Sequence, residues 1–477
     1  MGSVDRAWLR MDDPANLMIV NALIVLAEPL SRAQLSALIG ERLGWIPRRR
    51  LCVARGWVWD RWREHEVRID EHVHEHPRPE SDADLRAQVS ELVSKPLDPQ
   101  RPLWELHLIP GPSGGSVILA RVHHSLGDGL ALLLVLLSLT DVEPEPRRDN
   151  PLRALFGGRG DHREAASPGW HGCTDRSEAR VGAGGDAQDT VERARRFLRE
   201  VMPTGMKLML HQDHRALEDE RDHPASELRR GARLLGAAAR DLGALLVRRP
   251  DSATVFRGQL DVQKRVAWSR PIPLARLRQR RLGTVNDILL AAITGSLRRY
   301  ILARGDAPDG VEMRAAVPVN LRGLAELARL GNRCGLVFLT LPIGIADPRA
   351  RLTEIHRRMD ELKHSVEPLV TWGILELMGS SPKLVERLIL DYFAKRVSFV
   401  MTNVPGPERR LYLAGREITD LMFWVPQSGR VGLGVSMFSY AGAVRLGIAC
   451  DARLVPDPEA LIASFDEELD SMLGSPT

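Results

Sequence analysis

Residues His123–Gly129 read His-His-Ser-Leu-Gly-Asp-Gly, with an apolar run on each side of them. Upstream, residues 116–122 (SVILARV) are β-branched and apolar and follow the turn-like sequence GPSGG at 111–115, which predicts a strand. Downstream, residues 130–139 (LALLLVLLSL) are too long for a typical strand and too short to span a bilayer, which favours a buried helix. The motif therefore brings two imidazoles to a strand end, and loops that leave rigid strands commonly carry chemistry.

The composition indicates a globular protein. Its 477 residues predict two or three domains, and a hydrophobic content of 44% is ample for packed cores. The net charge is only +4, and six of the basic residues are lysines. Because the sequence contains no recognisable nucleic-acid-binding module and no concentration of charge, we expect no nucleic-acid partner.

The cysteines and the N-terminus indicate the compartment. Four cysteines, at 52, 173, 334 and 450, form no Cys-x-x-Cys pair, which argues against a zinc module and a disulfide framework. The N-terminus lacks the pattern of a signal peptide, and no apolar run reaches the roughly eighteen residues of a membrane-spanning helix. We therefore expect a cytoplasmic protein with at most peripheral membrane contact.

Residues 1–140 are expected to form an N-terminal half of alternating strands and helices, which indicates α/β layers. Their patterns predict strands at 18–26, 57–62, 67–70, 103–109 and 116–122, and helices at 31–43, capped by Ser31, and at 81–93.

Three alternating histidines in this half, His72, His74 and His76, would share one face of a strand, as metal ligands do. A partly exposed strand rich in His and Glu accounts for the same pattern, because no carboxylate or cysteine is evidently committed as a further ligand. We predict no metal site.

Residues 141–261 are expected to be a linker, partly disordered, because the stretch from 157 to 185 is too polar and glycine-rich to offset its ordering entropy. It also contains two amphipathic candidates for helices, at 191–210 and 227–249. These helices either pack across the two halves or lie on a membrane surface, and we favour packing.

Residues 262–477 are expected to form a second α/β half. The predicted strands lie at 265–268, 311–319, 335–341, 398–404 and 430–449, and the predicted helices at 284–300, 349–363 and 458–473. Two such halves imply a cleft between them, where ligand sites are favoured.

A histidine at a strand end is able to take a proton from a hydroxyl and return it to a leaving group, provided that the ring is oriented and the oxyanion is stabilised. Asp128 either orients His124 directly or fixes the loop through an arginine, and the sequence leaves both open. Asn286, Thr402 and Asn403 are the candidate donors elsewhere in the chain.

The sequence lacks the motifs of other classes of nucleophilic enzyme. Gly-x-Ser-x-Gly is absent, since residues 434–438 (GVSMF) lack the second glycine. Neither a phosphate loop nor a Gly-x-Gly-x-x-Gly turn is found. Base catalysis without a covalent enzyme intermediate is therefore favoured.

The motifs together resemble those of the wax ester synthase/acyl-CoA:diacylglycerol acyltransferase (WS/DGAT) family, one of the CoA-dependent acyltransferases that share His-x-x-x-Asp. The matching segments are His123–Gly129, Pro102–Trp104, Asn286–Asp287, Pro318–Arg322, Gly331–Arg333, Thr402–Pro407 and Ser439–Gly442. The first segment alone also suits peptide-synthetase condensation domains, whereas the whole set is more specific.

This resemblance implies an α/β fold of two chloramphenicol-acetyltransferase-like subdomains with mixed sheets and an active-site tunnel between them. It also implies O-acyl transfer from a long-chain acyl-CoA to diacylglycerol, a long-chain alcohol or both. His124 would be the general base, acyl-CoA would be a substrate, and no cofactor would be needed. We expect the protein to associate peripherally with the inner face of the membrane or with lipid droplets.

The same resemblance implies roles for the other motif residues. Asp128 would be mainly structural, His123 would shape the pocket, and Asn286 would place substrate or stabilise charge. Gly129 would allow close approach of backbone and substrate. Trp104, Thr402 and Asn403 are expected to be substrate-contacting or structural residues.

Three departures from the family pattern bear on substrate choice. Residues 16–19 read Asn-Leu-Met-Ile, where the family pattern has Asn-Pro-Met-His, and residues 254–258 (TVFRG) lack the usual Leu-Asn-Gly. Thr402 occupies the position of a serine and keeps the hydroxyl. The first two would alter the acyl or alcohol channel. Two alternatives stay open: the same fold acting on a polyketide-type alcohol or a carrier-bound amine, and a non-catalytic lipid-surface protein.

Overall fold

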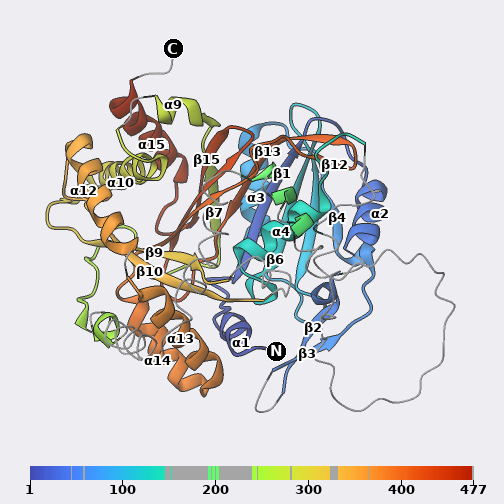
Figure 1. The fold of residues 1–477 in the computed structure, drawn as a ribbon, viewed down its shortest axis with the longest axis horizontal. Coiled ribbons are helices and arrows are strands. Elements are labelled where there is room, and N and C mark those ends of the chain that lie inside the picture. The colour runs from blue at the N-terminus through green and yellow to red at the C-terminus, as the bar shows by residue number, and fades with distance from the viewer. Residues whose placement is uncertain are drawn as a thin grey trace, which may run out of the picture.

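Two mixed β-sheets, each covered by helices, make up the fold of this computed structural model (Figure 1). The structure describes residues 1–43, 46–56, 60–145, 152, 192–194, 196–198, 200–202, 239–243, 245, 247–279, 282–322, 331–363 and 365–474.

The first sheet carries the histidine motif. Its order is β12 (Tyr412–Leu413), β13 (Arg416–Trp424), β1 (Ile19–Leu26), β6 (Ser116–His123), β5 (Trp104–Pro110) and β4 (Val73–Glu75). Side chains alternate between its faces: Ile118 packs with α2 (Arg32–Arg42) and α4 (Gly129–Leu139), while Val117 and Leu119 pack with α3 (Asp82–Val93). Both faces are therefore buried.

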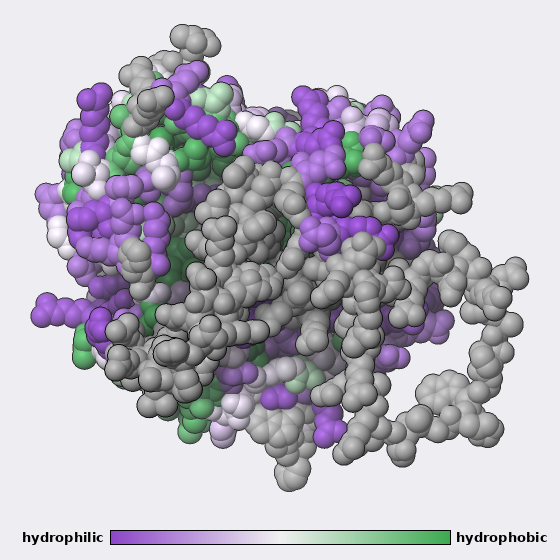
Figure 2. All heavy atoms as spheres, viewed as in Figure 1, coloured by the Kyte–Doolittle hydropathy of each residue, from purple (hydrophilic) through white to green (hydrophobic). Residues whose placement is uncertain are grey.

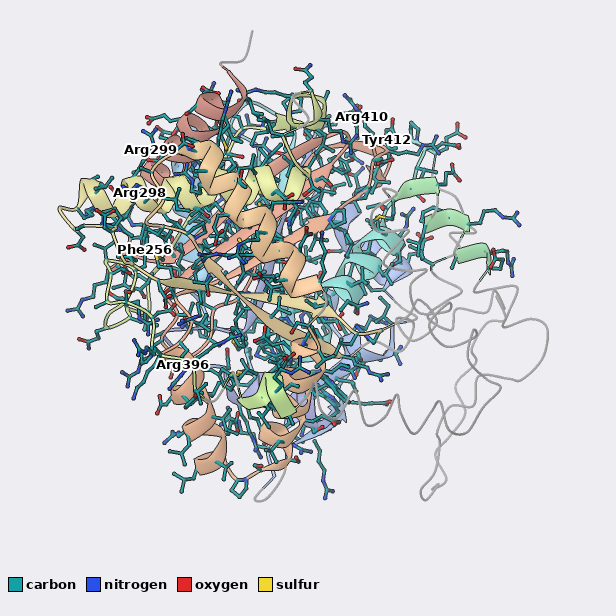
Figure 3. The ribbon with its side chains drawn as sticks, turned by 60° about the vertical axis from the view of Figure 1, so that its left-hand side comes forward. Phe256, Arg298, Arg299, Arg396, Arg410 and Tyr412 are labelled. Atoms are coloured by element: carbon teal, nitrogen blue, oxygen red, sulfur yellow. The ribbon has the colours of Figure 1, made fainter. Side chains whose placement is uncertain are left out.

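The second sheet has the order β10 (Cys334–Leu341), β9 (Met313–Asn320), β11 (Phe399–Pro405), β14 (Leu433–Tyr440), β15 (Ala443–Asp451) and β7 (Lys264–Trp268), with β8 (Ile272–Pro273) paired to β15. α10 (Val285–Ala303), α12 (Pro348–Lys363) and α15 (Pro458–Leu473) pack together in its core. Figure 3 shows Arg298 and Arg299 beside each other on α10, where Arg299 pairs with Glu468 of α15.

The remaining elements lie outside these two sheets. They are the hairpin β2 (Leu51–Ala54) and β3 (Arg61–Glu64), the helices α1 (Ser3–Arg10), α9 (Leu274–Arg278), α13 (Glu367–Ser380) and α14 (Lys383–Ala394), and the 3-10 turns Pro47–Arg50, Ile69–Glu71 and His124–Leu126. α1 packs on α13, so the start of the chain lies against the C-terminal half (Figure 1).

A strand exchange joins the two halves. β13 pairs antiparallel with β1, from Asn21 opposite Trp424 to Leu26 opposite Ile418, before the chain returns to the second sheet as β14. Residues 412–424 thus complete the first sheet, although they lie within the expected C-terminal half, 262–477. That half is not confined to one sheet.

Most predicted elements exist, but three local predictions need correction. The strand predicted at 67–70 is wrong, because Ile69–Glu71 forms a 3-10 turn that the His72 N–H closes on the Ile69 carbonyl at 2.9 Å. Of the strand predicted at 57–62, the structure describes only residues 60–62. The strand observed there, β3, covers Arg61–Glu64. The strand predicted around the three histidines is β4, which contains only His74 of them.

His72 and His76, which flank β4, are engaged with protein groups. His72 Nδ1 bonds the Trp104 carbonyl at 2.7 Å, and His76 Nε2 lies 2.9 Å from His107 Nδ1. In the part of the chain that the structure describes, no group of three or more His, Cys, Asp or Glu residues is arranged to hold a metal.

The expected linker falls largely outside the described residues, including 153–191, 203–238 and Cys173. The residues described within 192–201 and 239–247 are helical, and Leu198, Val201 and Leu245 are buried in the cores of the molecule. For these residues packing, and not membrane contact, is the observed environment. Within the described ranges, no helix has both the length and the apolar character that a membrane crossing requires.

Candidate active site

His124 stands at the turn between β6 and α4. β6 ends at His123, the 3-10 turn His124–Leu126 follows, and Asp128 caps α4 by accepting the Ala131 N–H at 3.1 Å. The apolar strand and helix are both buried, so the turn between them is held at both ends. This is the local arrangement that the sequence predicts.

Asn332 orients the ring of His124. The Nδ2 group of Asn332 donates to Asp5 Oδ1 at 3.0 Å and to the His124 carbonyl at 2.8 Å, so Asn332 Oδ1 must be an acceptor. That oxygen lies 3.0 Å from His124 Nδ1. This network assigns the proton of neutral His124 to Nδ1 and leaves the lone pair on Nε2.

α1 contributes directly to the surroundings of His124. The indole of Trp8 stacks on the imidazole with 4.2 Å between the ring centroids. Asp5, on the same helix, pairs with Arg48 at 3.0 Å, and Arg48 also donates to the Ser125 carbonyl at 3.2 Å. The N-terminal helix and the histidine turn are therefore fastened to each other.

Asp128 fastens the same turn to the C-terminal half. Its Oδ2 accepts from the guanidinium of Arg322 in a buried ion pair and from the Arg333 N–H at 3.2 Å. The Asp128 N–H also donates to the Gly331 carbonyl at 3.2 Å. The sequence leaves open whether Asp128 orients His124 directly or fixes the loop through an arginine. The contact observed is the one with an arginine, Arg322.

Burial lowers the pKa of His124 below its ordinary value, an effect that the nearby Asp128 carboxylate partly offsets. A lowered pKa keeps the imidazole neutral at neutral pH. Together with the tautomer, this makes Nε2 available as a base.

An apolar cavity of about 1010 Å³, including its open part, contains His124. It extends between α1 and the elements β10, α13 and α14, so both halves form its wall. Its polar lining is sparse, namely Thr371, Ser428 and the thiol of Cys334, whose pKa burial raises to about 12. His124 keeps accessible surface because it faces this space.

His123, the first histidine of the motif, has a different environment. Its ring is 2% exposed, and its Nδ1 accepts the Ser125 N–H at 3.1 Å. It is not among the residues that line the cavity. In this structure His123 shapes the turn.

The structure brings Asn286 and Asn403 together but does not join them to His124. Asn403 Nδ2 donates to Asn286 Oδ1 at 2.8 Å, and Thr402 is buried on β11 opposite Ser436. None of the three lines the cavity that contains His124. Their part in stabilising an oxyanion stays a prediction.

Trp104 and Gly129 also lie apart from the cavity lining. Trp104 is buried on β5, where its indole N–H donates to the Arg49 carbonyl at 3.0 Å and its ring stacks on His72. A Cβ at Gly129 would meet no heavy atom within 4 Å, so packing within the chain does not require this glycine.

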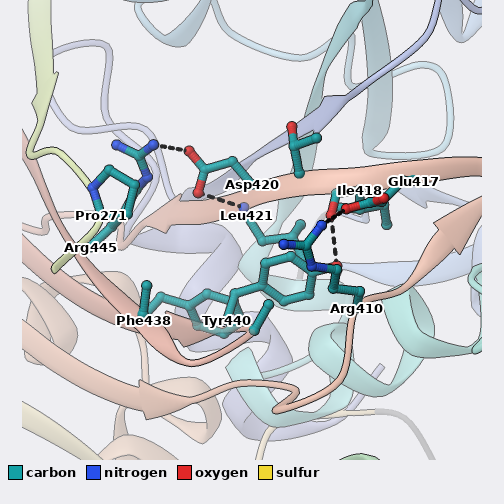
Figure 4. Close-up of a pocket in the computed structure, with 12 residues that line it drawn as sticks. Pro271, Arg410, Glu417, Ile418, Asp420, Leu421, Phe438, Tyr440 and Arg445 are labelled. Atoms are coloured by element: carbon teal, nitrogen blue, oxygen red, sulfur yellow. Dashed lines mark hydrogen bonds and ion pairs between the residues drawn. The ribbon is translucent and has the colours of Figure 1, made fainter. Parts of the chain in front are cut away.

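A second cavity opens between β13 and the β14–β15 turn (Figure 4). Its charged groups are paired with one another, Arg410 with Glu417 and Arg445 with Asp420. It contains none of the predicted site residues.

The sequence patterns indicate no specific role for Asp5, Trp8 or Asn332. Asn332 lies in the matched segment Gly331–Arg333, which was a signal for its importance but not for its partner. Trp8 and Asp5 carried no signal of their own, because their roles depend on α1 packing against a turn more than 110 residues away.

Replacing Asn332 with alanine should lower kcat by roughly 10- to 100-fold, the effect of losing one hydrogen bond to a group that becomes charged. KM should change little, because Asn332 does not line the cavity. Its carbonyl favours the protonated imidazole, so its loss should lower the His124 pKa and shift the acid limb of kcat/KM to lower pH.

The control for this variant is Asn21→Ala, which removes a buried amide on β1 that bonds only the Ile19 carbonyl among its described contacts. The control should keep both kcat and the pH profile. An unchanged pH profile in Asn332→Ala would contradict the orienting role.

Two family models match the chain. The wax ester synthase/diacylglycerol acyltransferase catalytic domain matches residues 1–288, and the WS/DGAT C-terminal domain matches residues 330–473. A putative diacylglycerol O-acyltransferase of Mycobacterium bovis is 27% identical over 411 residues, which cover 82% of this chain and 76% of that protein. A second, from Mycobacterium tuberculosis, is 25% identical and covers 99% of this chain and 90% of its own length.

Solved structures share the fold. The wax ester synthase/diacylglycerol acyltransferase of Marinobacter aquaeolei has a TM-score of 0.64 at 19% identity and covers 98% of this chain and 97% of its own. The first condensation domain of the calcium-dependent antibiotic synthetase has a TM-score of 0.57 at 14% identity, covering 100% and 96%. The expected fold of two chloramphenicol-acetyltransferase-like subdomains is confirmed. The chain belongs to the wax ester synthase/diacylglycerol acyltransferase family of acyl-transferring enzymes.

Proposed function

We propose that this enzyme transfers a long-chain fatty acyl group from acyl-CoA to the hydroxyl of diacylglycerol, of a long-chain alcohol, or of both, with His124 as the general base. The observation that carries the proposal is an oriented, neutral His124 that faces a cavity with almost wholly apolar walls. Such a cavity suits a fatty chain, because apolar surface is favourably removed from water.

The chemistry needs one proton carrier. His124 Nε2 takes the acceptor's hydroxyl proton as the oxygen attacks the thioester carbonyl, which gives a tetrahedral oxyanion. The oxyanion collapses, the carbon–sulfur bond breaks, and the imidazolium returns the proton to the departing CoA sulfur. No electrons are exchanged and acyl-CoA brings the activated group, so we expect no cofactor.

Asn332 and Asp5 stabilise the protonated form of His124 through Nδ1, the ring nitrogen that does not take the substrate proton. When His124 becomes an imidazolium, its Nδ1–H donates to Asn332 Oδ1, and the Asp5 carboxylate accepts from the other end of the same amide. Hydrogen bonds to a charged group are stronger than those to a neutral one, so the network favours the protonated intermediate state.

The proposal predicts that purified protein releases free CoA from palmitoyl-CoA when diacylglycerol or hexadecanol is present. Release is measured with a thiol reagent, and the ester product is identified by mass spectrometry. Folded protein that releases no CoA with either acceptor would contradict the proposal. Release only with a polyketide-type alcohol or a carrier-bound amine would reassign the acceptor.

We also propose that the enzyme works at a lipid–water boundary, the inner face of the membrane or a lipid droplet, because both the acceptor and the product partition into lipid. The alternative of a non-catalytic lipid-surface protein is less well supported, since such a protein has no need for an oriented, neutral histidine in an apolar cavity.

A further inference from the structure

The outer side of α13 and α14 exposes an unusual amount of apolar surface. Among the described residues, nine large hydrophobic side chains are exposed, and five of them belong to these two helices. They are Leu369, Leu377, Leu384, Val385 and Leu388, of which Leu384 is 71% and Leu388 63% exposed. Figure 2 shows apolar colour at the lower end of the molecule, where α13 and α14 lie in Figure 1. We call these five residues the outer apolar face.

The inner side of the same helices lines the cavity of His124. Ile374, Leu375 and Met378 of α13 contribute to the lining, as do Leu390 and Phe393 of α14. α13 and α14 therefore form a wall that is apolar toward the cavity and that also exposes large apolar side chains toward solvent. A helix in a water-facing wall normally carries polar residues on its outer side.

This wall is anchored to the helix that stacks on His124. Arg6 and Arg10 of α1 donate to the carbonyls of Gly379 and Ser381 at 2.9 and 3.0 Å. A Cβ on Gly379 would lie 1.7 Å from the Ser3 carbonyl oxygen, so the two helix backbones meet at a position that only glycine permits. The outer apolar face is thus held in a fixed relation to the active site.

Charges of both signs lie beside the face, and the two cations share the turns of α14 that carry Leu384 and Leu388. Lys383 and Arg387 are exposed on α14 between and beside the leucines, and neither has an ion-pair partner among the described contacts. The exposed carboxylates beside the face are Asp391, one turn further along α14, and Glu376 of α13, next to Leu377. Leucines with flanking cations are the pattern of a helix that lies in the headgroup region of anionic lipid.

We propose that the outer apolar face of α13 and α14 docks the enzyme onto a phospholipid surface, so that the lipid acceptor passes from that surface to the adjoining cavity. The proposal rests on the proposed function for its choice of occupant, because a lipid substrate places this wall against lipid. The leucines enter the acyl boundary, and the two cations meet anionic headgroups.

The test is flotation of the full-length protein with vesicles of phosphatidylcholine, phosphatidylglycerol and diacylglycerol. The variant Leu384→Gln/Leu388→Gln keeps good helix formers on α14 and removes the two most exposed leucines. Its binding should fall at least tenfold. The matched control, Val262→Gln/Leu302→Gln, removes two half-exposed apolar residues elsewhere and should bind as the unchanged protein does.

A second measurement separates docking from catalysis. With hexanoyl-CoA and a short soluble alcohol, the α14 variant should release CoA at the unchanged rate, because neither leucine lines the cavity. With diacylglycerol in vesicles, its rate should fall in step with its binding.

Equal vesicle binding by the α14 variant and the unchanged protein overturns the proposal, as does an equal loss in the control. A change of oligomeric state in the α14 variant, measured by sedimentation, with unchanged vesicle binding would assign the face to a second copy of the chain and also overturn it. Vesicle binding that depends on these leucines, without any acyl transfer, would support the docking face and contradict the proposed function.

Discussion

Replacing His124 with alanine should lower kcat by at least about 10²-fold, the usual contribution of a positioned general base. The variant loses the only group in the described cavity lining that is suited to take a proton near neutral pH. KM for the acyl donor should change little, because the apolar walls of the cavity remain. The measurement is CoA release under saturating substrate, with thermal unfolding to show that the variant is folded.

His65→Ala is the matched control, because this histidine follows β3, its side chain bonds only the adjacent Glu66 carbonyl among its described contacts, and it should be dispensable for turnover. Full activity in His124→Ala would refute the base assignment. If vesicle binding persisted in that variant and no acyl transfer were detected in the unchanged protein, the non-catalytic alternative would replace the proposed function.

Replacing Asp128 with alanine should reduce the free energy of unfolding by about 3–5 kcal/mol, since it leaves the buried guanidinium of Arg322 without its counter-charge. The loss of the α4 N-cap adds about 1 kcal/mol. The same contacts hold the histidine turn against Gly331–Arg333, so turnover should fall as well. Urea unfolding followed by fluorescence measures the first effect.

The double variant Asp128→Ala/Arg322→Met should recover part of the lost stability, because it removes the stranded charge. Glu91→Ala breaks the exposed ion pair between Glu91 of α3 and Lys95, which follows that helix, and serves as the control, with little change expected. If the Asp128→Ala variant were as stable as the unchanged protein, the buried Asp128–Arg322 ion pair would make no net contribution to the free energy of unfolding.

The elements that the sequence predicts well are those specified by neighbouring residues. The strand and the helix on either side of the histidine motif follow from two apolar runs, and Ser31 forms the expected cap on α2 together with Gln34. Such patterns need no knowledge of distant parts of the chain.

The elements that it misses depend on tertiary contacts. α13 has apolar residues toward the cavity and exposes Leu369 and Leu377 toward solvent, so it lacks the one-sided pattern by which a helix is recognised. The alternation of β13 predicts a strand but not which sheet it joins. The partners of His124 come from residue 332 and from the first helix, and no local pattern links these three places.

The strand exchange also has a consequence for how the chain acquires its structure. β1 is made early in synthesis, yet its partner β13 emerges only with residues 416–424, after most of the chain. Until then β1 presents a row of unpaired N–H and C=O groups, which is a template for wrong pairing between chains. Pairings of such large sequence separation also slow folding. Fragments that end before residue 412, including one cut at the end of the catalytic-domain match at 288, should therefore aggregate, and the two halves should fold as one cooperative unit.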